Sequence, residues 1–128
     1  MAGEAILIVE DNPINLKLSR LLLIAEGYEV RTATNADEAR TVLAVFHPRL
    51  ILMDIQLPGK NGLDFTRELK SNSTFKDIII VALTAYAMKG DEETAKAAGC
   101  DGYITKPISV ATFPFRITHY LEHLPDTL

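Results

Sequence analysis

Five short apolar runs, separated by segments that carry helix-starting and helix-ending residues, constrain the fold of this chain most strongly. The runs are AILIV, EVRTA, LILMD, IIIVAL and GYIT, at residues 5–9, 29–33, 50–54, 78–83 and 102–105. Short runs rich in β-branched residues predict strands. Regular alternation of strand and helix predicts a parallel sheet with right-handed crossovers and helices on both faces. The sequence therefore predicts an α/β fold with a doubly wound, five-stranded parallel sheet.

Residues that favour helix ends lie between these runs. Asn12 and Pro13 predict the start of a first helix, which ends at Gly27, and Asn35 predicts the start of the second. The predicted helices cover residues 13–26, 36–46, 63–71, 92–98 and 110–124, with Asp91 opening the fourth and Ser109 preceding the fifth. Pro114 lies inside the fifth, so this helix must either start late or bend.

The character of individual runs predicts their place in the sheet. The run at 78–83 is apolar throughout and is expected in the interior, whereas Glu29 and Arg31 mark the run at 29–33 as an edge. Gly59 and Gly62 follow the third run in the stretch LPGKNG, and both are interpreted as turn residues.

Length and composition indicate the class of protein. A chain of 128 residues with 48% hydrophobic residues is expected to form a single globular domain over 1–128, with no output domain. No apolar run approaches the length of about 18 residues that a membrane span needs, and the first residues lack the basic start of a signal peptide. The single cysteine, Cys100, agrees with a reducing compartment, so we expect a cytoplasmic protein. The net charge of −4 argues against nucleic acid as a partner.

Polar residues collect where the predicted strands end. Glu10 and Asp11 follow the first run, Asp54 ends the third, Thr84 follows the fourth, and Lys106 follows the fifth. The carboxyl ends of parallel strands meet at one edge of a sheet, where functional groups gather. Two carboxylates about 4 Å apart repel each other by about 4 kcal/mol at an effective dielectric constant of about 20. Three carboxylates therefore need compensation, which Lys106 and an oxygen-bound divalent cation such as Mg²⁺ would supply.

This edge would suit a phosphoryl group on Asp54, because the metal and the lysine would neutralise its charge. Any one of these residues taken singly is better explained as a solvated loop residue or as part of an incidental salt bridge. Their joint occurrence at four strand ends favours the functional interpretation.

Several stretches together resemble the response-regulator receiver domain of two-component phosphorelays. These stretches are ILIVEDN, LILMDIQLPGKNGLDFTREL, IIIVALTA and AAGCDGYITKPI, and the similarity covers essentially the whole chain. These stretches are most similar to those of stand-alone single-domain regulators of the DivK type, and they also resemble receivers attached to hybrid kinases. The resemblance implies a flavodoxin-like, CheY-like (βα)5 fold with strand order 2-1-3-4-5.

The resemblance also implies roles for the residues at the sheet edge. Asp54 would be the phospho-acceptor and would share a Mg²⁺ ion, or alternatively Mn²⁺, with other ligands. Asp11 would bind the metal directly, Glu10 directly or through water, and Gln56 through its backbone carbonyl. Gln56 and Tyr86 also lie where receivers control the access of water to the aspartyl phosphate.

A second group of residues would respond to phosphorylation. Thr84 would hydrogen-bond a phosphoryl oxygen, Lys106 would pair with another, and Tyr103 would move inward with Thr84. The Lys106–Pro107 peptide bond would be cis. The protein would thus catalyse only its own phosphorylation and dephosphorylation, and it would not be an enzyme acting on other substrates.

The first predicted helix is too apolar for a single buried stripe. Leu18, Leu22 and Leu23 are expected to face the sheet, by comparison with receivers. Helical spacing then places Ile14, Leu21 and Ile24 on an outward face. Such a face would dock a sensor histidine kinase or a histidine phosphotransfer protein. The signal would pass on to a downstream protein target, from a monomer or weak dimer, since Pro114 lies in a region that receivers use for dimerisation.

Other functions remain as alternatives at this point. An aspartate-nucleophile phosphatase would carry a second acid two residues after the nucleophile, where this chain has Gln56. A nucleotide- or flavin-binding domain would want an anion-binding loop after the first strand, where this chain has EDNPIN. Two further alternatives are a phosphorylation-independent pseudo-receiver and a receiver cut from a hybrid histidine kinase.

Overall fold

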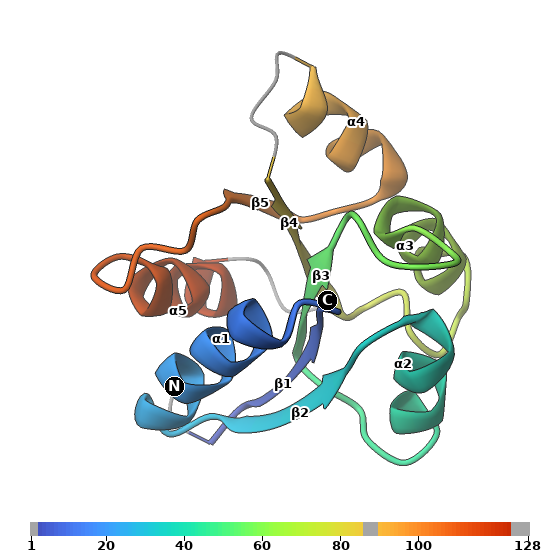
Figure 1. The fold of residues 1–128 in the computed structure, drawn as a ribbon. Helices are drawn as coiled ribbons and strands as arrows, with labels where there is room; N and C mark the ends of the chain where they lie inside the picture. Colours follow the sequence, from blue (N-terminus) through green and yellow to red (C-terminus); the bar gives the residue numbers. More distant parts are fainter. Residues whose placement is uncertain (1–2, 86–89, 124–128) are drawn as a thin grey trace.

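The computed structural model describes residues 3–85 and 90–123 of the chain, which form five strands and five helices in strict alternation (Figure 1). The strands are β1 (Ala5–Val9), β2 (Glu29–Ala33), β3 (Leu50–Asp54), β4 (Ile79–Thr84) and β5 (Gly102–Thr105). The helices are α1 (Pro13–Ala25), α2 (Ala36–Leu43), α3 (Gly62–Lys70), α4 (Asp91–Ala98) and α5 (Phe113–His123).

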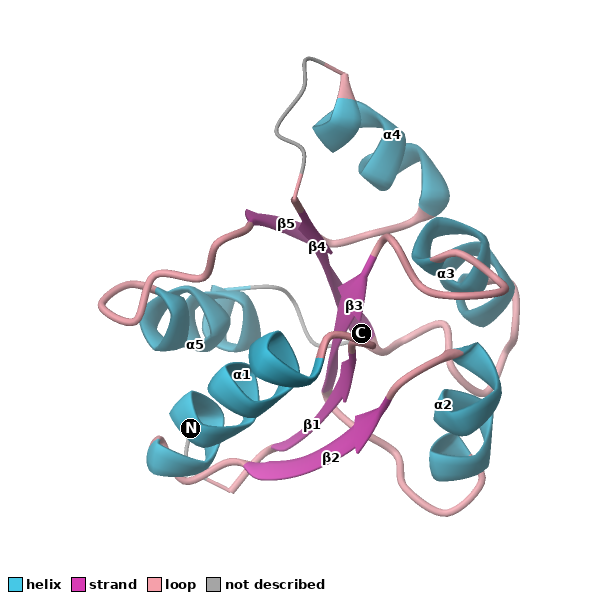
Figure 2. Cartoon of the chain, viewed as in Figure 1, coloured by secondary structure: helices cyan, strands magenta, loops and turns pink. Residues whose placement is uncertain are grey.

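The strands form one parallel sheet in the order β2-β1-β3-β4-β5, which confirms the predicted topology. α1 and α5 cover one face, and α2, α3 and α4 cover the other (Figure 2). β2, with Glu29 and Arg31, is an edge strand, and β4 lies in the interior, both as expected. None of the helices within residues 3–85 and 90–123 has both the length and the apolar character that a bilayer span requires.

Two hydrophobic clusters, one on each face, hold the helices against the sheet. Successive strand residues point to opposite faces, so a strand covered on both sides must be apolar throughout. Ile6 of β1 joins Leu23 of α1 and Ile117 of α5 in one cluster, whereas Leu7 joins Phe65 of α3 in the other. The two clusters fix the strands from both sides, and thereby fix the edge at which the strands end.

Some boundaries differ from the sequence-based expectation by one to three residues. α2 ends at Leu43 rather than at residue 46, because the chain leaves the helix there and buries Phe46 in the core. β4 covers residues 79–84 instead of 78–83. α4 begins at Asp91 itself, since Gly90 takes the capping position with a left-handed φ of 97°.

The proline in the last helix is explained by a late start. α5 begins at Phe113, so Pro114 lies in its first turn, where the missing backbone donor costs no intrahelical hydrogen bond. Ser109 does not start the helix directly. Its carbonyl oxygen accepts a hydrogen bond from the Phe113 backbone at 2.8 Å and forms a turn that leads into it. The predicted end at Leu124 lies outside the described residues.

The two glycines after β3 have different functions. Gly59 has a φ of 75°, which agrees with its interpretation as a turn residue. The same interpretation was wrong for Gly62, which begins α3. A Cβ atom at Gly62 would clash with the carbonyl oxygen of Asp54, so only glycine allows α3 to start this close to the end of β3.

Candidate functional site

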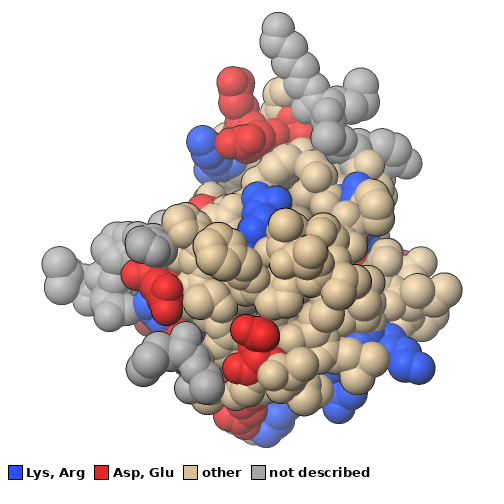
Figure 3. Space-filling model, turned by 90° about the vertical axis from the view of Figure 1, so that its left-hand side faces the viewer, with Lys and Arg blue, Asp and Glu red and all other residues tan. Residues whose placement is uncertain are grey.

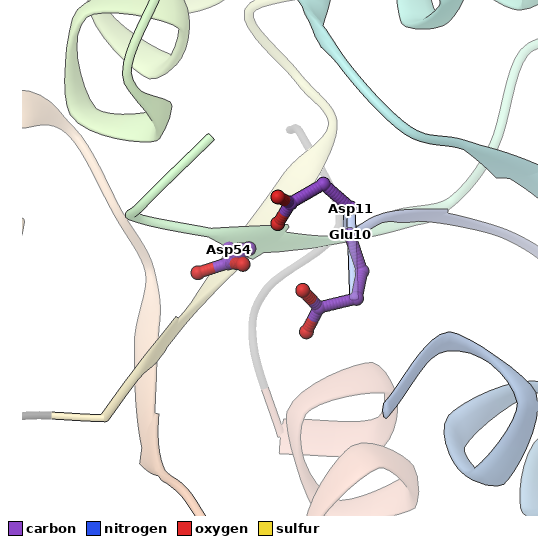
Figure 4. Close-up of side chains that lie close together, drawn as sticks. All are labelled: Glu10, Asp11 and Asp54. Atoms are coloured by element: carbon purple, nitrogen blue, oxygen red, sulfur yellow. The ribbon is translucent and has the colours of Figure 1, made fainter. Parts of the chain in front are cut away.

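Three carboxylates meet at the carboxyl ends of β1 and β3. Glu10 and Asp11 directly follow β1, and Asp54 is the last residue of β3. One carboxylate oxygen from each lies within 4.8 Å of those of the other two, and Figure 4 shows the three side chains around a common space. Glu10 is fully buried and Asp54 is 2% exposed, whereas Asp11 lies at the surface. The predicted convergence of these three residues is confirmed.

Lys106 brings a positive charge to the same place from the end of β5. Its Nζ lies 2.8 Å from Glu10 Oε1 and 3.2 Å from Asp54 Oδ2. The Lys106–Pro107 peptide bond is cis, as the resemblance to receivers implied. The lysine thus offsets one of the negative charges at this edge of the sheet, and the carboxylates remain in excess.

Backbone amides satisfy part of the remaining hydrogen-bonding capacity. The amide of Gln56 donates to Asp54 Oδ1 at 3.0 Å, and that of Asn12 donates to Glu10 Oε2 at 3.2 Å. The buried Glu10 Oε1 has the Lys106 ammonium group at 2.8 Å as its charged partner, and no backbone amide among the described residues donates to it. A buried carboxylate oxygen in this state, within an acidic cluster, fits a site that receives a hard divalent cation.

The electrostatics of the site raise the pKa of Glu10 to about 7. Burial is the largest cause, and a hydrogen bond with the Asp54 carboxyl group acts in the same direction. The ammonium group of Lys106 and the amide of Asn12 lower this pKa, but by less. Burial lowers the pKa of Lys106, whereas its contacts with Glu10 and Asp54 outweigh burial and raise it overall. The site therefore holds more negative charge than it can stabilise near neutral pH, which favours cation binding.

Thr84 ends β4, the strand that pairs with β3 next to Asp54, and its side chain contacts Tyr103 of β5. Thr84 is buried at the end of β4, and its carbonyl oxygen accepts a hydrogen bond from the Lys106 backbone at 2.7 Å. Tyr103 is half-buried on β5 and packs against the cluster beneath α3 and α4. Burial and the negative charge of Asp91 raise the pKa of Tyr103, while a hydrogen bond with the Thr84 side chain lowers it. The structure thus brings together the residues that were predicted to form the switch.

Side chains of α5 that the sequence did not reveal hold the backbone of Tyr103. Arg116 Nη2 donates to the Tyr103 carbonyl oxygen at 2.9 Å, and the Tyr120 hydroxyl lies 3.2 Å from the Tyr103 amide. The Tyr120 ring also fills the space beside Gly102, where a Cβ atom would lie 2.6 Å from it. An arginine and a tyrosine four residues apart on a helix are too common a pattern to predict such contacts.

The outward face of α1 has the exposure predicted for it. Ile14, Leu21 and Ile24 are 76%, 51% and 42% exposed, and Leu23 is buried against the sheet. Leu22 is half-buried and packs against the core cluster beneath α1, as expected, whereas Leu18 is half-buried outside that cluster and Leu16 packs there instead. Ser19, which was not singled out from the sequence, is fully buried instead. Figure 3 shows the side of the molecule on which α1 and α5 lie, and uncharged residues cover much of its centre.

Gln56 is exposed in the loop that follows Asp54, and its backbone adjoins the site through the hydrogen bond to Asp54. Tyr86, the other residue expected to affect water access, lies outside the described residues. Cys100 lies in the core beside Thr66, and burial raises the pKa of its thiol.

The fold and the site define a class of protein. Residues 6–117 match the family described as the response regulator receiver domain, and the chain belongs to this family.

Among individual proteins, the chain is 48% identical over 118 residues to the polar-differentiation response regulator DivK of Brucella ovis and of Brucella abortus. This match covers 92% of the chain and 96% of each relative.

Solved structures of receivers are also similar. The receiver domain of a sensor histidine kinase from Pseudomonas aeruginosa PAO1, described with a magnesium ion coordinated in its active-site cleft, is 33% identical with a TM-score of 0.83. That match covers 94% of this chain and 98% of the other. The phosphorylated cyanobacterial phytochrome response regulator RcpA is 27% identical with a TM-score of 0.83, over 97% and 98% of the two chains. Both solved receivers thus share the fold of this chain; one is described with a bound magnesium ion and the other in a phosphorylated state.

Proposed function

We propose that this protein is a phosphorelay response regulator in which Asp54 accepts a phosphoryl group from a phosphohistidine of a partner protein. The proposal rests above all on one observation, which is the position of the buried Asp54 carboxylate between Lys106 and the acidic residues Glu10 and Asp11. Membership of the receiver family supports it. The same arrangement disfavours a pseudo-receiver, because the acceptor, the lysine, the threonine and the acidic pair are all present and close together.

In the proposed reaction, an Asp54 carboxylate oxygen attacks the phosphorus atom of the phosphohistidine. The P–N bond breaks, and the imidazole leaves with the electron pair and takes up a proton. Before transfer, Lys106 pairs with Asp54 and Glu10. As negative charge moves onto the phosphoryl oxygens, the same ammonium group is placed to pair with one of them. The amide of Gln56 holds the other Asp54 oxygen, which orients the attacking carboxylate.

The cation expected here is Mg²⁺, with Mn²⁺ as an alternative, held by Asp11, Asp54, Glu10 and the backbone carbonyl of Gln56. When bound, it supplies neutralising charge for the phosphoryl oxygens. The carboxylates of this chain supply the hard oxygen ligands, and Lys106 limits their mutual repulsion. Beyond this self-directed chemistry, we propose no enzymatic activity on other substrates.

Phosphorylation would change the protein through Thr84 and Tyr103. A phosphoryl group adds negative charge and acceptor oxygens beside the Thr84 hydroxyl, which would then turn toward it. Tyr103, hydrogen-bonded to Thr84, would follow, and the surface near β5 and α5 would change with it. A downstream protein would recognise this change, and we expect the chain to act in the cytoplasm as a monomer or weak dimer.

The test of this function is phosphorylation by a small donor. Wild-type protein, Asp54→Ala and the control Asp64→Ala, which changes an exposed aspartate of α3, are incubated with acetyl phosphate with and without Mg²⁺. We expect the intact mass to show one added phosphoryl group in wild type and control, dependent on Mg²⁺ and lost in Asp54→Ala. If no adduct forms, a beryllofluoride titration followed by tyrosine fluorescence separates rapid turnover from absent chemistry. A silent titration would favour the pseudo-receiver.

The partner in this reaction would dock on the exposed apolar face of α1, formed by Ile14, Leu21 and Ile24. Leu21→Glu should slow transfer from a phosphorylated histidine phosphotransfer protein about tenfold or more, as the loss of a central interface contact does. Acetyl phosphate should still phosphorylate the variant. Val45→Glu is the matched control, because Val45 is 81% exposed but follows α2, on the other side of the sheet. Loss of both reactions in Leu21→Glu would contradict docking at this face.

A further inference from the structure

The loop between β3 and α3, residues 55–61, is bonded to the acidic site at its start and is closed at its base beside Asp54. At its start, the amide of Gln56 donates to Asp54 Oδ1 at 3.0 Å. At its end, the amide of Gly62 donates to the Ile55 carbonyl oxygen at 2.9 Å. The missing side chain of Gly62 lets the chain pack directly on the Asp54 carbonyl group. A shift of this loop therefore changes the surroundings of the Asp54 carboxylate.

Lys60 gives the same loop a further attachment, away from Glu10, Asp11 and Asp54. Its Nζ donates to Glu68 Oε1 on α3 at 2.6 Å. Arg40 on α2 donates to both oxygens of Glu68, through Nε and Nη2, each at 2.8 Å. The third nitrogen of this guanidinium group, Nη1, lies 2.6 Å from Asp37 Oδ1. Lys60 is thus joined to a network that connects the loop with two helices, both drawn on the right of Figure 1.

The network holds Lys60 more firmly than a single surface ion pair would. Hydrogen bonds from Arg40 and Lys60 lower the pKa of Glu68 to about 2, although burial acts in the opposite direction. The Arg40 guanidinium group also lies 5.2 Å from the centre of the ring of Phe65, which is fully buried. Isolated exposed pairs contribute little because they are screened and cost side-chain entropy, whereas two-point arginine contacts and networks fix the geometry.

We propose that Lys60 is a positioning residue for divalent-cation binding at Glu10, Asp11 and Asp54, and that it acts by holding the loop that carries Gln56. This inference rests on the proposed function, because it assumes that these carboxylates bind a cation. Lys60 is 39% exposed and belongs to none of the groups at the acidic site itself, so its effect must pass through the loop.

Two effects of Lys60 on cation binding have opposite signs, which makes the inference testable. As a positive charge, Lys60 repels a cation at the acidic site, so removing the charge should tighten binding. As a positioning residue, Lys60 restricts the loop, so removing its contact with Glu68 should weaken binding. Solvent screens the first effect at this exposed position. We therefore expect the second effect to dominate.

The experiment measures the Mg²⁺ dissociation constant of the intact protein by titration calorimetry. For Lys60→Met we expect binding about threefold weaker than wild type, in the range of well-ordered exposed ion pairs. Lys60→Arg, which keeps a donor for Glu68, should restore binding. Lys96→Met is the matched control, because Lys96 pairs with Glu92 in a similar surface contact on α4. Faster hydrogen exchange of the amides in residues 55–61 should accompany the weaker binding in Lys60→Met only.

The outcomes separate the inference from the function on which it depends. If wild type binds Mg²⁺ and Lys60→Met binds it equally or more tightly, the positioning role is wrong and Lys60 acts at most as a charge. If Lys96→Met weakens binding as much as Lys60→Met, the effect is not specific to the loop and the inference also fails. The proposed function itself fails if wild type does not bind Mg²⁺, or if Asp54→Ala binds it as well as wild type does.

Discussion

Replacing Glu10 by glutamine should stabilise the cation-free protein above pH 7 and change its stability little at pH 5. Burial and the neighbouring Asp54 raise the pKa of Glu10 from its ordinary value of 4.5 to about 7. Between these values, the folded protein holds a proton that the unfolded chain has released. The stabilising contribution is therefore fully present below pH 4.5 and is lost as the pH rises through about 7. Glutamine has nearly the same shape and cannot ionise, so the variant avoids this loss.

The magnitude follows from the difference between the two pKa values. A difference from 4.5 to about 7 corresponds to about 3 kcal/mol of unfolding free energy. This is an upper limit for Glu10, because it shares its titration with Asp54 and part of the energy belongs to the pair. For a domain of this size, it corresponds to a difference in melting temperature of roughly 10 °C. Glu68, whose pKa is lowered to about 2, titrates below this pH window and does not affect the comparison.

The assay is thermal unfolding of wild type and Glu10→Gln in EDTA, followed by circular dichroism at pH 5 and pH 8. As the pH rises from 5 to 8, the variant should become more stable relative to wild type. Both proteins contain the same histidines, so the contributions of those residues cancel in this comparison. Glu92→Gln, on the exposed surface of α4, should show no such change. Added Mg²⁺ at pH 8 should raise the melting temperature of wild type more than that of Glu10→Gln. An equal difference between wild type and Glu10→Gln at both pH values would refute the reasoning.

Two further substitutions test the packing around the site. Gly62→Ala should cost more than about 3 kcal/mol in urea unfolding, because its Cβ would clash with the Asp54 carbonyl group. Gly59→Ala, with open space but a left-handed φ, should cost only about 1 kcal/mol, and equal losses would contradict the close-contact explanation. Ser19→Ala should stabilise the protein by about 1 kcal/mol, because the buried Ser19 hydroxyl has no hydrogen-bond partner among the described residues. A destabilised Ser19→Ala would show that this hydroxyl is hydrogen-bonded in solution.

The fold could be predicted because its signals are local and repeated. Each strand is a short apolar run, and caps such as Asn12 and Asn35 accept hydrogen bonds at the helix starts, as predicted. The ends of helices were predicted less accurately. α2 stops before Phe46, and the ring of Phe46 packs in the core. Packing between distant segments decides such boundaries, and a local sequence pattern carries no information about that packing.

The candidate site could be predicted because parallel strands place their carboxyl ends together. Knowing that Glu10, Asp54 and Lys106 each lie at the end of a strand was enough to expect them at one edge of the sheet. The sequence did not indicate that Glu10 would be fully buried while Asp11, its neighbour, stays exposed. Adjacent residues point in different directions as the chain leaves β1, and only the surrounding structure decides which one the core covers.

Contacts between side chains that carry no distinctive motif could not be predicted. The hydrogen bond from Lys60 to Glu68, those from Arg40 to both oxygens of Glu68, and that between Tyr120 and the Tyr103 backbone each join residues without a distinctive motif. Exposed charged residues occur throughout the chain, and their pairing depends on the relative placement of whole helices.

The sequence by itself therefore determined the order of the elements, the edge at which chemistry occurs and the types of residue found there. These follow from hydrophobic periodicity and from the geometry of parallel strands, which act over a few residues. Only the tertiary structure decided how much each carboxylate is buried and how far the pKa of Glu10 rises. It also decided that the Lys60 side chain joins the loop beside Asp54 to Glu68. Such properties depend on desolvation and on distances of a few ångströms between distant segments, and those exist only once the chain has folded.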